Sequence, residues 1–133
     1  MKAIRILGIA VFLLGSCARP PASKTQTTGI QRTELQRHDL GIPGREAIQV
    51  LVALDPGVAF PRHSHPGEEL IYVLEGSLEY QVGDEPAVTL SAGEILFIPD
   101  GAIHAARNVG HGRGVELATY IVAKGEPLVV LAD

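Results

Sequence analysis

The sequence is poor in cysteine and in aromatic residues. Among 133 residues there is one cysteine and no tryptophan, and tyrosine and phenylalanine occur three times each. With a single cysteine, the chain can form no internal disulfide and carries no CxxC motif for zinc binding or redox chemistry. The shortage of aromatic rings also weakens the case for a surface on which nucleobases stack.

Positive charge is scarce as well. Eleven lysines and arginines stand against fifteen aspartates and glutamates, which gives a formal net charge of −4. Because no basic patch is present, we expect no nucleic-acid partner. The length suits one domain, no internal repeat is evident, and 46% hydrophobic residues suffice for one core.

Residues 1–17 are predicted to be a secretory signal. Lys2 and Arg5 precede an uncharged apolar stretch, residues 6–15, which has the length of a signal-peptide core and is too short to span a bilayer. A buried globular helix is the disfavoured alternative, since the stretch has no amphipathic period.

The signal ends in Leu-Gly-Ser-Cys, which resembles the bacterial lipobox. In signals of that kind, cleavage precedes the cysteine, and the cysteine is then lipidated. We therefore expect an exported protein that contacts the membrane only through a lipid anchor at Cys17. The alternative is ordinary cleavage near Ala18, which would leave a free periplasmic domain.

The rest of the chain divides into a tether and a β domain. Residues 18–32 are rich in Pro, Ser, Thr and Gln, and are predicted to be flexible. Residues 33–133 are predicted to form one domain, because short apolar segments alternate with turn signals and no helical period occurs. The expected strands, the first of which overlaps the tether, are about 30–38, 46–54, 58–63, 69–75, 77–82, 87–90, 94–98, 103–109, 115–123 and 127–131.

Three histidines and one glutamate have the spacing of a metal site. His63 and His65 lie two residues apart, so their side chains point the same way on an extended strand. Glu69 follows the turn at Pro66, and His104 begins a later strand. Three imidazoles and a carboxylate suit a first-row divalent transition metal and are too rich in nitrogen for calcium or magnesium.

These residues fall in two longer motifs that resemble the two motifs of the cupin superfamily. The motifs are Gly57-x5-His63-x-His65-x3-Glu69-x6-Gly76 and Gly93-x5-Pro99-x-Gly101-x2-His104-x3-Asn108, and sixteen residues separate them. The short separation is that of compact single-domain bacterial cupins.

The resemblance implies an all-β fold, a single cupin jelly-roll β-barrel. It also implies that His63, His65, Glu69 and His104 are the ligands of one metal ion, which would be Fe, Mn, Ni, Cu or Zn. The glycines and the proline of the motifs would then be turn and corner residues. Four protein ligands would leave two positions of an octahedral metal open for water, dioxygen or a chelating substrate.

Strand parity predicts which residues surround this site. Small or apolar side chains share the faces of His104 and Glu69, namely Ala102, Ala106, Ile71 and Val73. Gln49 either reaches into the pocket or lies on an exposed face. Tyr80 and Phe97 are expected in the core rather than against a substrate.

The leading functional hypothesis is a metal-dependent enzyme of the dioxygenase type that resembles the small quercetinase-like cupins. Its substrate would be a small oxygen-bearing molecule that chelates the metal, and Glu69 would be the catalytic proton carrier. A non-catalytic envelope protein that holds a metal or a small ligand is the second hypothesis, and an isomerase or lyase that needs no oxygen is the third. A homodimer that pairs through strand exchange is also possible.

Overall fold

The computed structural model describes residues 24–133, which form eleven strands and no helix. The strands are β1 (Lys24–Thr27), β2 (Ile30–Asp39), β3 (Arg45–Leu54), β4 (Ala59–Ser64), β5 (Gly67–Glu75), β6 (Ser77–Val82), β7 (Val88–Ser91), β8 (Ile95–Ile98), β9 (His104–Asn108), β10 (Gly114–Ala123) and β11 (Val130–Leu131).

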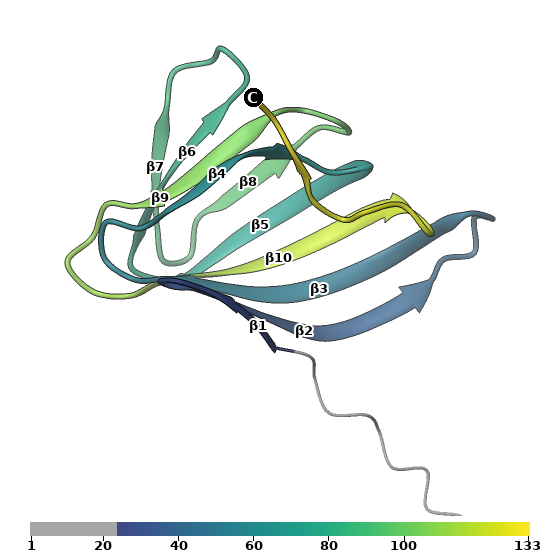
Figure 1. Ribbon diagram of the computed structural model, residues 1–133, viewed down its shortest axis with the longest axis horizontal. Coiled ribbons are helices and arrows are strands. Elements are labelled where there is room, and N and C mark those ends of the chain that lie inside the picture. The colour runs from purple at the N-terminus through teal and green to yellow at the C-terminus, as the bar shows by residue number, and fades with distance from the viewer. Residues whose placement is uncertain (1–23) are drawn as a thin grey trace, which may run out of the picture.

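The strands form two antiparallel sheets that face each other (Figure 1). The six-stranded sheet has the order β1-β2-β3-β10-β5-β8, and the five-stranded sheet has the order β11-β4-β9-β6-β7. Strands that are distant in sequence, such as β3 and β10, are neighbours, as a jelly roll requires. The predicted all-β jelly-roll barrel is confirmed.

All ten expected strands are present, β5 begins two residues earlier than expected, and the larger differences lie near the two ends of the described chain. The strand expected over 127–131 shortens to the two residues of β11. The predicted tether, 18–32, is wrong over its last part: β1 pairs with β2, and Ile30 is buried against the core. The composition of this segment is polar, but the edge of a sheet needs few apolar side chains, so composition did not reveal β1.

The core lies between the two sheets in two groups of side chains. β3 and β10 alternate buried and less buried residues, so that Ile48, Val50 and Val52 from one strand pack beside Ala118 and Val122 from the other. The second group is built mainly from β5, β6, β8 and β9. This period of two is the pattern by which one face of each strand is buried.

The outer face of β5 and β8 carries exposed apolar side chains. Leu70 lies opposite Phe97, and Tyr72 lies opposite Ile95, in the register of the two strands. Because Phe97 is 58% exposed, its prediction as a core residue is wrong. Its strand position places it on the outer face, which the apolar sequence of β8 does not distinguish from the inner one.

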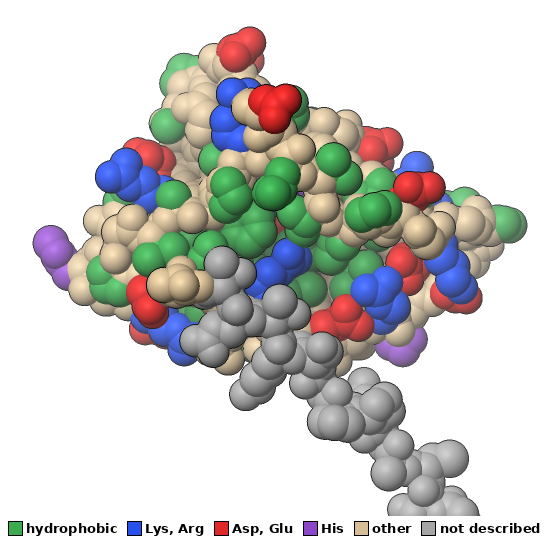
Figure 2. Space-filling view, viewed as in Figure 1, with side chains coloured by type: hydrophobic (Ala, Val, Ile, Leu, Met, Phe, Trp, Pro, Cys, Tyr) green, Lys and Arg blue, Asp and Glu red, His purple; other side chains and the backbone are tan. Residues whose placement is uncertain are grey.

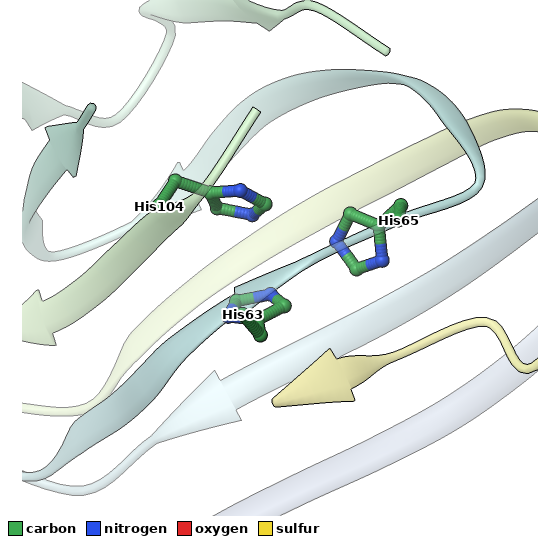
Figure 3. A group of neighbouring side chains, drawn as sticks. All are labelled: His63, His65 and His104. Carbon is green, nitrogen blue, oxygen red and sulfur yellow. The ribbon is translucent and has the colours of Figure 1, made fainter. Parts of the chain in front are cut away.

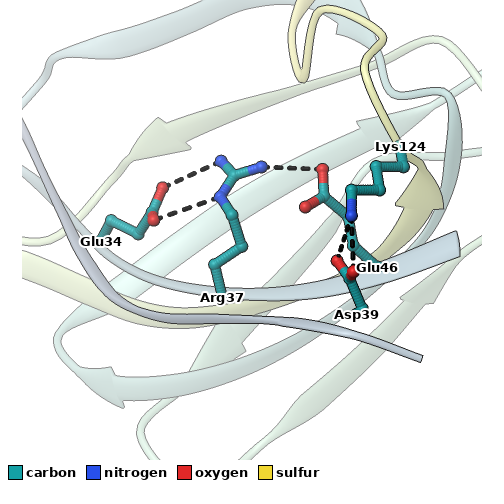
Figure 4. A network of polar contacts seen from close by, with 5 residues as sticks. All are labelled: Glu34, Arg37, Asp39, Glu46 and Lys124. Atoms are coloured by element: carbon teal, nitrogen blue, oxygen red, sulfur yellow. Dashed lines mark hydrogen bonds and ion pairs between the residues drawn. The ribbon is translucent and has the colours of Figure 1, made fainter.

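A polar network fastens β2 to β3 and to the residue that follows β10 (Figure 4). Arg37 bridges Glu34 and the buried Glu46, with its Nη1 2.7 Å from Glu46 Oε1. Lys124 pairs with Asp39, and both of these side chains are exposed. These contacts lie at the end of β2 that is distant from β1.

No helix among residues 24–133 is long and apolar enough to cross a membrane. The predicted signal and Cys17 lie outside the described residues. β2 lies next to the edge strand β1 of one sheet, and β11 is an edge strand of the other. Pairing of two copies stays a prediction.

Candidate metal centre

The three histidines of the two motifs converge between the sheets (Figure 3). His63 lies near the end of β4, His65 follows that strand directly, and His104 is the first residue of β9. His63 and His104 are partners in the register of β4 and β9. One ring nitrogen from each histidine lies within 4.8 Å of the others, and all three side chains are buried.

Backbone carbonyls fix the orientation of the three rings. Nδ1 of His63 lies 2.8 Å from the carbonyl of Pro61, and Nδ1 of His104 lies 3.0 Å from that of Ala102. Nδ1 of His65 contacts the carbonyl of Leu128, in the segment before β11. A carbonyl oxygen can only accept, so each Nδ1 carries the hydrogen, and in the neutral rings each Nε2 holds a lone pair.

Glu69 completes the group from the opposite sheet. Its Oε2 lies 3.0 Å from Nε2 of His104 and 3.3 Å from Nε2 of His65. Despite these short separations, neither Glu69 Oε2 nor His65 Nε2 has a hydrogen-bond partner of acceptable geometry. Acceptor atoms that face one another in a buried site need a cation between them, which is either a proton on an imidazole or a metal ion.

Burial and the short distances between these side chains shift their pKa values. Burial, together with the neighbouring His104, lowers the pKa of His63 to about 4. Burial alone would raise the pKa of Glu69, but the contacts with His104 and His65 outweigh it and lower that pKa to about 2. Neutral imidazole at His63 and ionised carboxylate at Glu69 are the forms that bind metals. Burial likewise opposes protonation of His104, yet its contact with Glu69 raises its pKa.

The three histidines could therefore hold one first-row divalent cation, and the Glu69 carboxylate beside His65 and His104 is a candidate fourth donor. Their Nδ1 contacts are the outer hydrogen bonds that usually orient metal-binding histidines. All four residues predicted from the sequence are brought together.

The group opens into a narrow cavity of about 20 Å³, which reaches about 340 Å³ only when the solvent-filled space at its mouth is included. As expected, Ile71 and Ala106 line it, whereas Ala102 and Val73 pack into the neighbouring core. The complete lining is Arg32, Val52, Leu54, Phe60, His63, Glu69, Ile71, Tyr80, His104, Ala106, Glu116 and Tyr120. Gln49 is absent from it, because its amide binds Thr119 and Gln36 on the outer face of the sheet.

The sequence analysis missed Glu116, which is a second buried acid in this cavity. The hydroxyl of Tyr80 donates a hydrogen bond to Glu116 Oε2. Burial and the negative charge of Glu69 raise the pKa of Glu116 to about 8, so this carboxyl is protonated at neutral pH. Glu116 is therefore a second candidate acid in the cavity besides Glu69.

A signal for Glu116 was present in the alternation of β10. Gly114, Glu116, Ala118, Tyr120 and Val122 share one face, and all five are buried. A glutamate in the phase of the buried residues is a candidate for a cavity position. Tyr80 was expected in the core and is buried, but it also lines the cavity.

The family model described as a cupin domain matches residues 50–122, which is more than half of the chain. The chain belongs to the cupin family. All four candidate ligands of this cupin lie within the matched region, and its site can hold a metal.

Two curated relatives match this cupin over part of their length. Germin-like protein 1-1 of Oryza sativa subsp. japonica is 32% identical over 116 residues, which cover 80% of the chain and 49% of the relative. Dimethylsulfoniopropionate lyase DddQ of Ruegeria pomeroyi is 35% identical over 57 residues, which cover 43% of the chain and 28% of the lyase. The matches thus span about half or less of the length of these relatives.

Solved structures share the fold. The crystal structure of the Ruegeria pomeroyi lyase superposes with a TM-score of 0.58 and 28% identity, covering 65% of the chain and 43% of the lyase. A conserved protein with a double-stranded β-helix domain from Klebsiella pneumoniae gives a TM-score of 0.67 at 21% identity, covering 95% of the chain and 99% of that protein. The second likeness shows the fold alone.

Proposed function

We propose that this cupin is a mononuclear metal-dependent enzyme that acts on a small oxygen-bearing substrate, with a dioxygenase-type oxidation as its leading reaction. The observation that carries the proposal is the buried set of Nε2 lone pairs from three histidines that faces the Glu69 carboxylate. A bound divalent metal would supply Lewis acidity toward substrate oxygens and, if redox-active, chemistry with dioxygen.

The residues around the site would bind the metal, exclude water and transfer a proton. His63, His65, Glu69 and His104 would hold the metal, and the apolar wall that includes Ile71 and Val52 would exclude bulk water. Glu69, the one carboxylate among the ligands, would exchange a proton with the substrate through the carboxylate oxygen that does not hold the metal.

An oxygen-independent lyase or isomerase is the second candidate, and Glu116 favours it. A carboxyl that is neutral at pH 7 beside the hydroxyl of Tyr80 can give a proton to a leaving group or to a carbanion in the cavity. The likeness to a protein named as a lyase supports this candidate over the matched segment.

Metal content and oxygen dependence test the proposal together. Protein purified without added metals is assayed by mass spectrometry and is then screened with catechol-like and diketone compounds in an oxygen electrode. Near-stoichiometric metal that is lost in His63→Ala and His104→Ala, together with oxygen uptake, is the expected result. Turnover that persists without oxygen would favour the lyase. A folded protein that takes up no divalent ion would contradict both and leave a non-catalytic binding protein.

We also propose that the chain is exported and anchored by a lipid at Cys17. The support is the sequence of residues 1–17. Metabolic labelling with palmitate should mark the wild type and should not mark Cys17→Ser. An unlabelled wild-type protein in the periplasmic fraction would replace the anchor with ordinary cleavage.

A further inference from the structure

One cationic side chain reaches the cavity, and it comes from the segment that was expected to be a tether. Arg32 lies on β2 opposite Val52, and both residues line the cavity. No other lysine or arginine of the described chain lines it. Figure 2 shows basic atoms in the middle of one face, within a hollow bordered by hydrophobic side chains.

Arg32 makes few contacts that satisfy its charge. Its Nη2 donates a hydrogen bond of 3.4 Å to the Tyr120 hydroxyl, and its guanidinium carbon lies 5.6 Å from the centre of the Phe60 ring. None of the ion pairs among residues 24–133 includes it, whereas Arg37 pairs with two glutamates. A guanidinium carries five N–H donors, and within residues 24–133 only one side-chain hydrogen bond of Arg32 is present.

The position of Arg32 is held by the two contacts that it does make. Stacking on an aromatic ring fixes the plane of a guanidinium, and a planar fork held in this way is suited to bind an oxyanion with two hydrogen bonds. Phe60 lies on β4, three residues before His63, so the platform belongs to the strand that carries the metal ligand.

Arg32 also lies close to the metal ligands. The Tyr120 ring, whose hydroxyl accepts the Arg32 hydrogen bond, lies edge-on to the His65 ring with 4.7 Å between centroids. Arg32, Tyr120 and the candidate ligands His63, Glu69 and His104 all line the same cavity.

We propose that Arg32 is a substrate-binding residue and that the substrate is a small molecule with two features, an oxygen pair that binds the metal and a carboxylate that binds Arg32. The inference rests on the proposed metal-dependent function and adds the substrate class. It predicts that the cavity prefers an acid over a neutral molecule of the same shape.

Two probes isolate this preference. 3,4-Dihydroxybenzoate and 3,4-dihydroxybenzamide present the same oxygen pair to a metal, but only the first carries a carboxylate. Their affinities for the zinc-loaded full-length protein are measured by calorimetry, after the metal content of each variant has been confirmed by mass spectrometry. A charge-assisted pair with Arg32 should make the wild type bind the acid about 10-fold or more tightly than the amide.

Variants decide whether Arg32 causes the preference. Arg32→Gln should bind acid and amide about equally while its zinc content is unchanged. Arg32→Lys should keep part of the preference, and it serves in place of Arg32→Gln should that variant fail to fold. Arg107→Gln is the matched control, since Arg107 lies on the exposed face of β9, and it should behave as the wild type.

The outcomes separate the two proposals. Full zinc content with an acid preference that survives in Arg32→Gln would overturn the role of Arg32 and leave the metal enzyme standing. An equal loss of affinity for both probes would assign Arg32 a purely structural role and overturn the inference in the same way. Absence of bound zinc in the wild type would overturn the proposed function and, with it, this inference.

Discussion

At the scale of single residues, Glu116 is the group whose environment departs most from that of an ordinary glutamate. Burial and the negative charge of Glu69 raise the pKa of Glu116 from 4.5 to about 8, and the hydrogen bond that it accepts from Tyr80 offsets only part of this rise. Between these two pH values the folded protein holds a proton that the unfolded chain has released. Folding is therefore linked to proton uptake at this residue.

The metal-free protein, kept in a chelator, should lose stability through Glu116 as the pH rises. A folded state that binds more protons has a free energy of unfolding that falls as pH rises through the window, here from about 4.5 to about 8. Glu116→Gln removes this ionisation and keeps a polar partner for Tyr80. The stability of the wild type relative to the variant should therefore fall across the window and level off outside it.

Urea unfolding of both proteins at several pH values measures this difference. Glu75→Gln, which removes an exposed carboxyl from the end of β5, controls for the loss of a negative charge. The contrary result is a difference between the free energies of unfolding of wild type and Glu116→Gln that does not change with pH. That result would show that the pKa of Glu116 is not raised by folding.

The four candidate metal ligands could be predicted from the sequence because they occupy fixed positions in two motifs that resemble those of the cupin superfamily. His63 and His65 share a strand face, and Glu69 and His104 complete two motifs of fixed length. The Glu116–Tyr80 pair has no such local signature, since its partners lie 36 residues apart and meet only when the two sheets face each other. Arg32 could not be predicted for another reason, because it lies at the end of a segment whose polar composition is typical of a tether.

At the scale of elements, the start of β5 controls where Glu69 lies. Gly67 has a φ of +156°, and a Cβ at this position would clash with the backbone oxygen of Ile121 and lie 2.7 Å from Cα of Val122. β5 therefore packs against β10 more closely than a side chain would permit. The position of Glu69, which lies two residues later on β5, therefore depends on this close approach of the two strands.

Gly67→Ala should consequently damage both stability and metal binding. The backbone of β5 must move away from β10, so we expect a loss of more than about 3 kcal/mol in the free energy of unfolding, together with weaker zinc binding. Gly93→Ala is the control, because Gly93 also has a positive φ but has open space around its Cβ position. It should cost roughly 1–2 kcal/mol and keep the zinc affinity. Equal costs for the two variants, measured by urea unfolding, would contradict the close-approach argument.

The polar network of β2 and β3 offers a second comparison between elements. Arg37→Gln would leave the carboxylate of Glu46 buried without its ion-pair partner, which should cost about 1–3 kcal/mol. Lys124→Gln breaks an exposed pair with Asp39 and should cost less than about 1 kcal/mol. Thermal unfolding of both variants at low and high salt tests which substitution costs more stability. A larger loss for Lys124→Gln than for Arg37→Gln would contradict the prediction.

The limits of interior strands could be located from the sequence by their burial pattern, whereas those of the edge strands β1 and β11 could not. Interior strands such as β3 and β10 alternate buried and half-buried residues, and turn residues bound them, so their limits can be read within about one residue. Pairing decides the ends of the sheets instead: β1 exists because β2 offers it a partner, and β11 keeps only the two residues that pair with β4.

At the scale of the whole molecule, the candidate metal centre joins the two sheets. His63 and His104 belong to β4 and β9 of the five-stranded sheet, and Glu69 belongs to β5 of the six-stranded sheet. His65 is oriented by the carbonyl of Leu128, which precedes the last strand. An ion bound by all four side chains would therefore link segments from most of the folded chain.

Metal binding should accordingly raise the stability of the entire domain and not of one loop. A ligand that binds only the folded state at 100 times its dissociation constant adds about 2.7 kcal/mol, which for a domain of this size corresponds to a rise of roughly 10 °C in Tm. Calorimetric melting of the full chain, with excess zinc and with chelator, should show one transition that shifts as a unit. His104→Ala should abolish the shift, whereas His111→Ala, which removes an exposed histidine outside the cavity, should retain it. A shift that His111→Ala removes, or that His104→Ala keeps, would place the stabilising ion elsewhere.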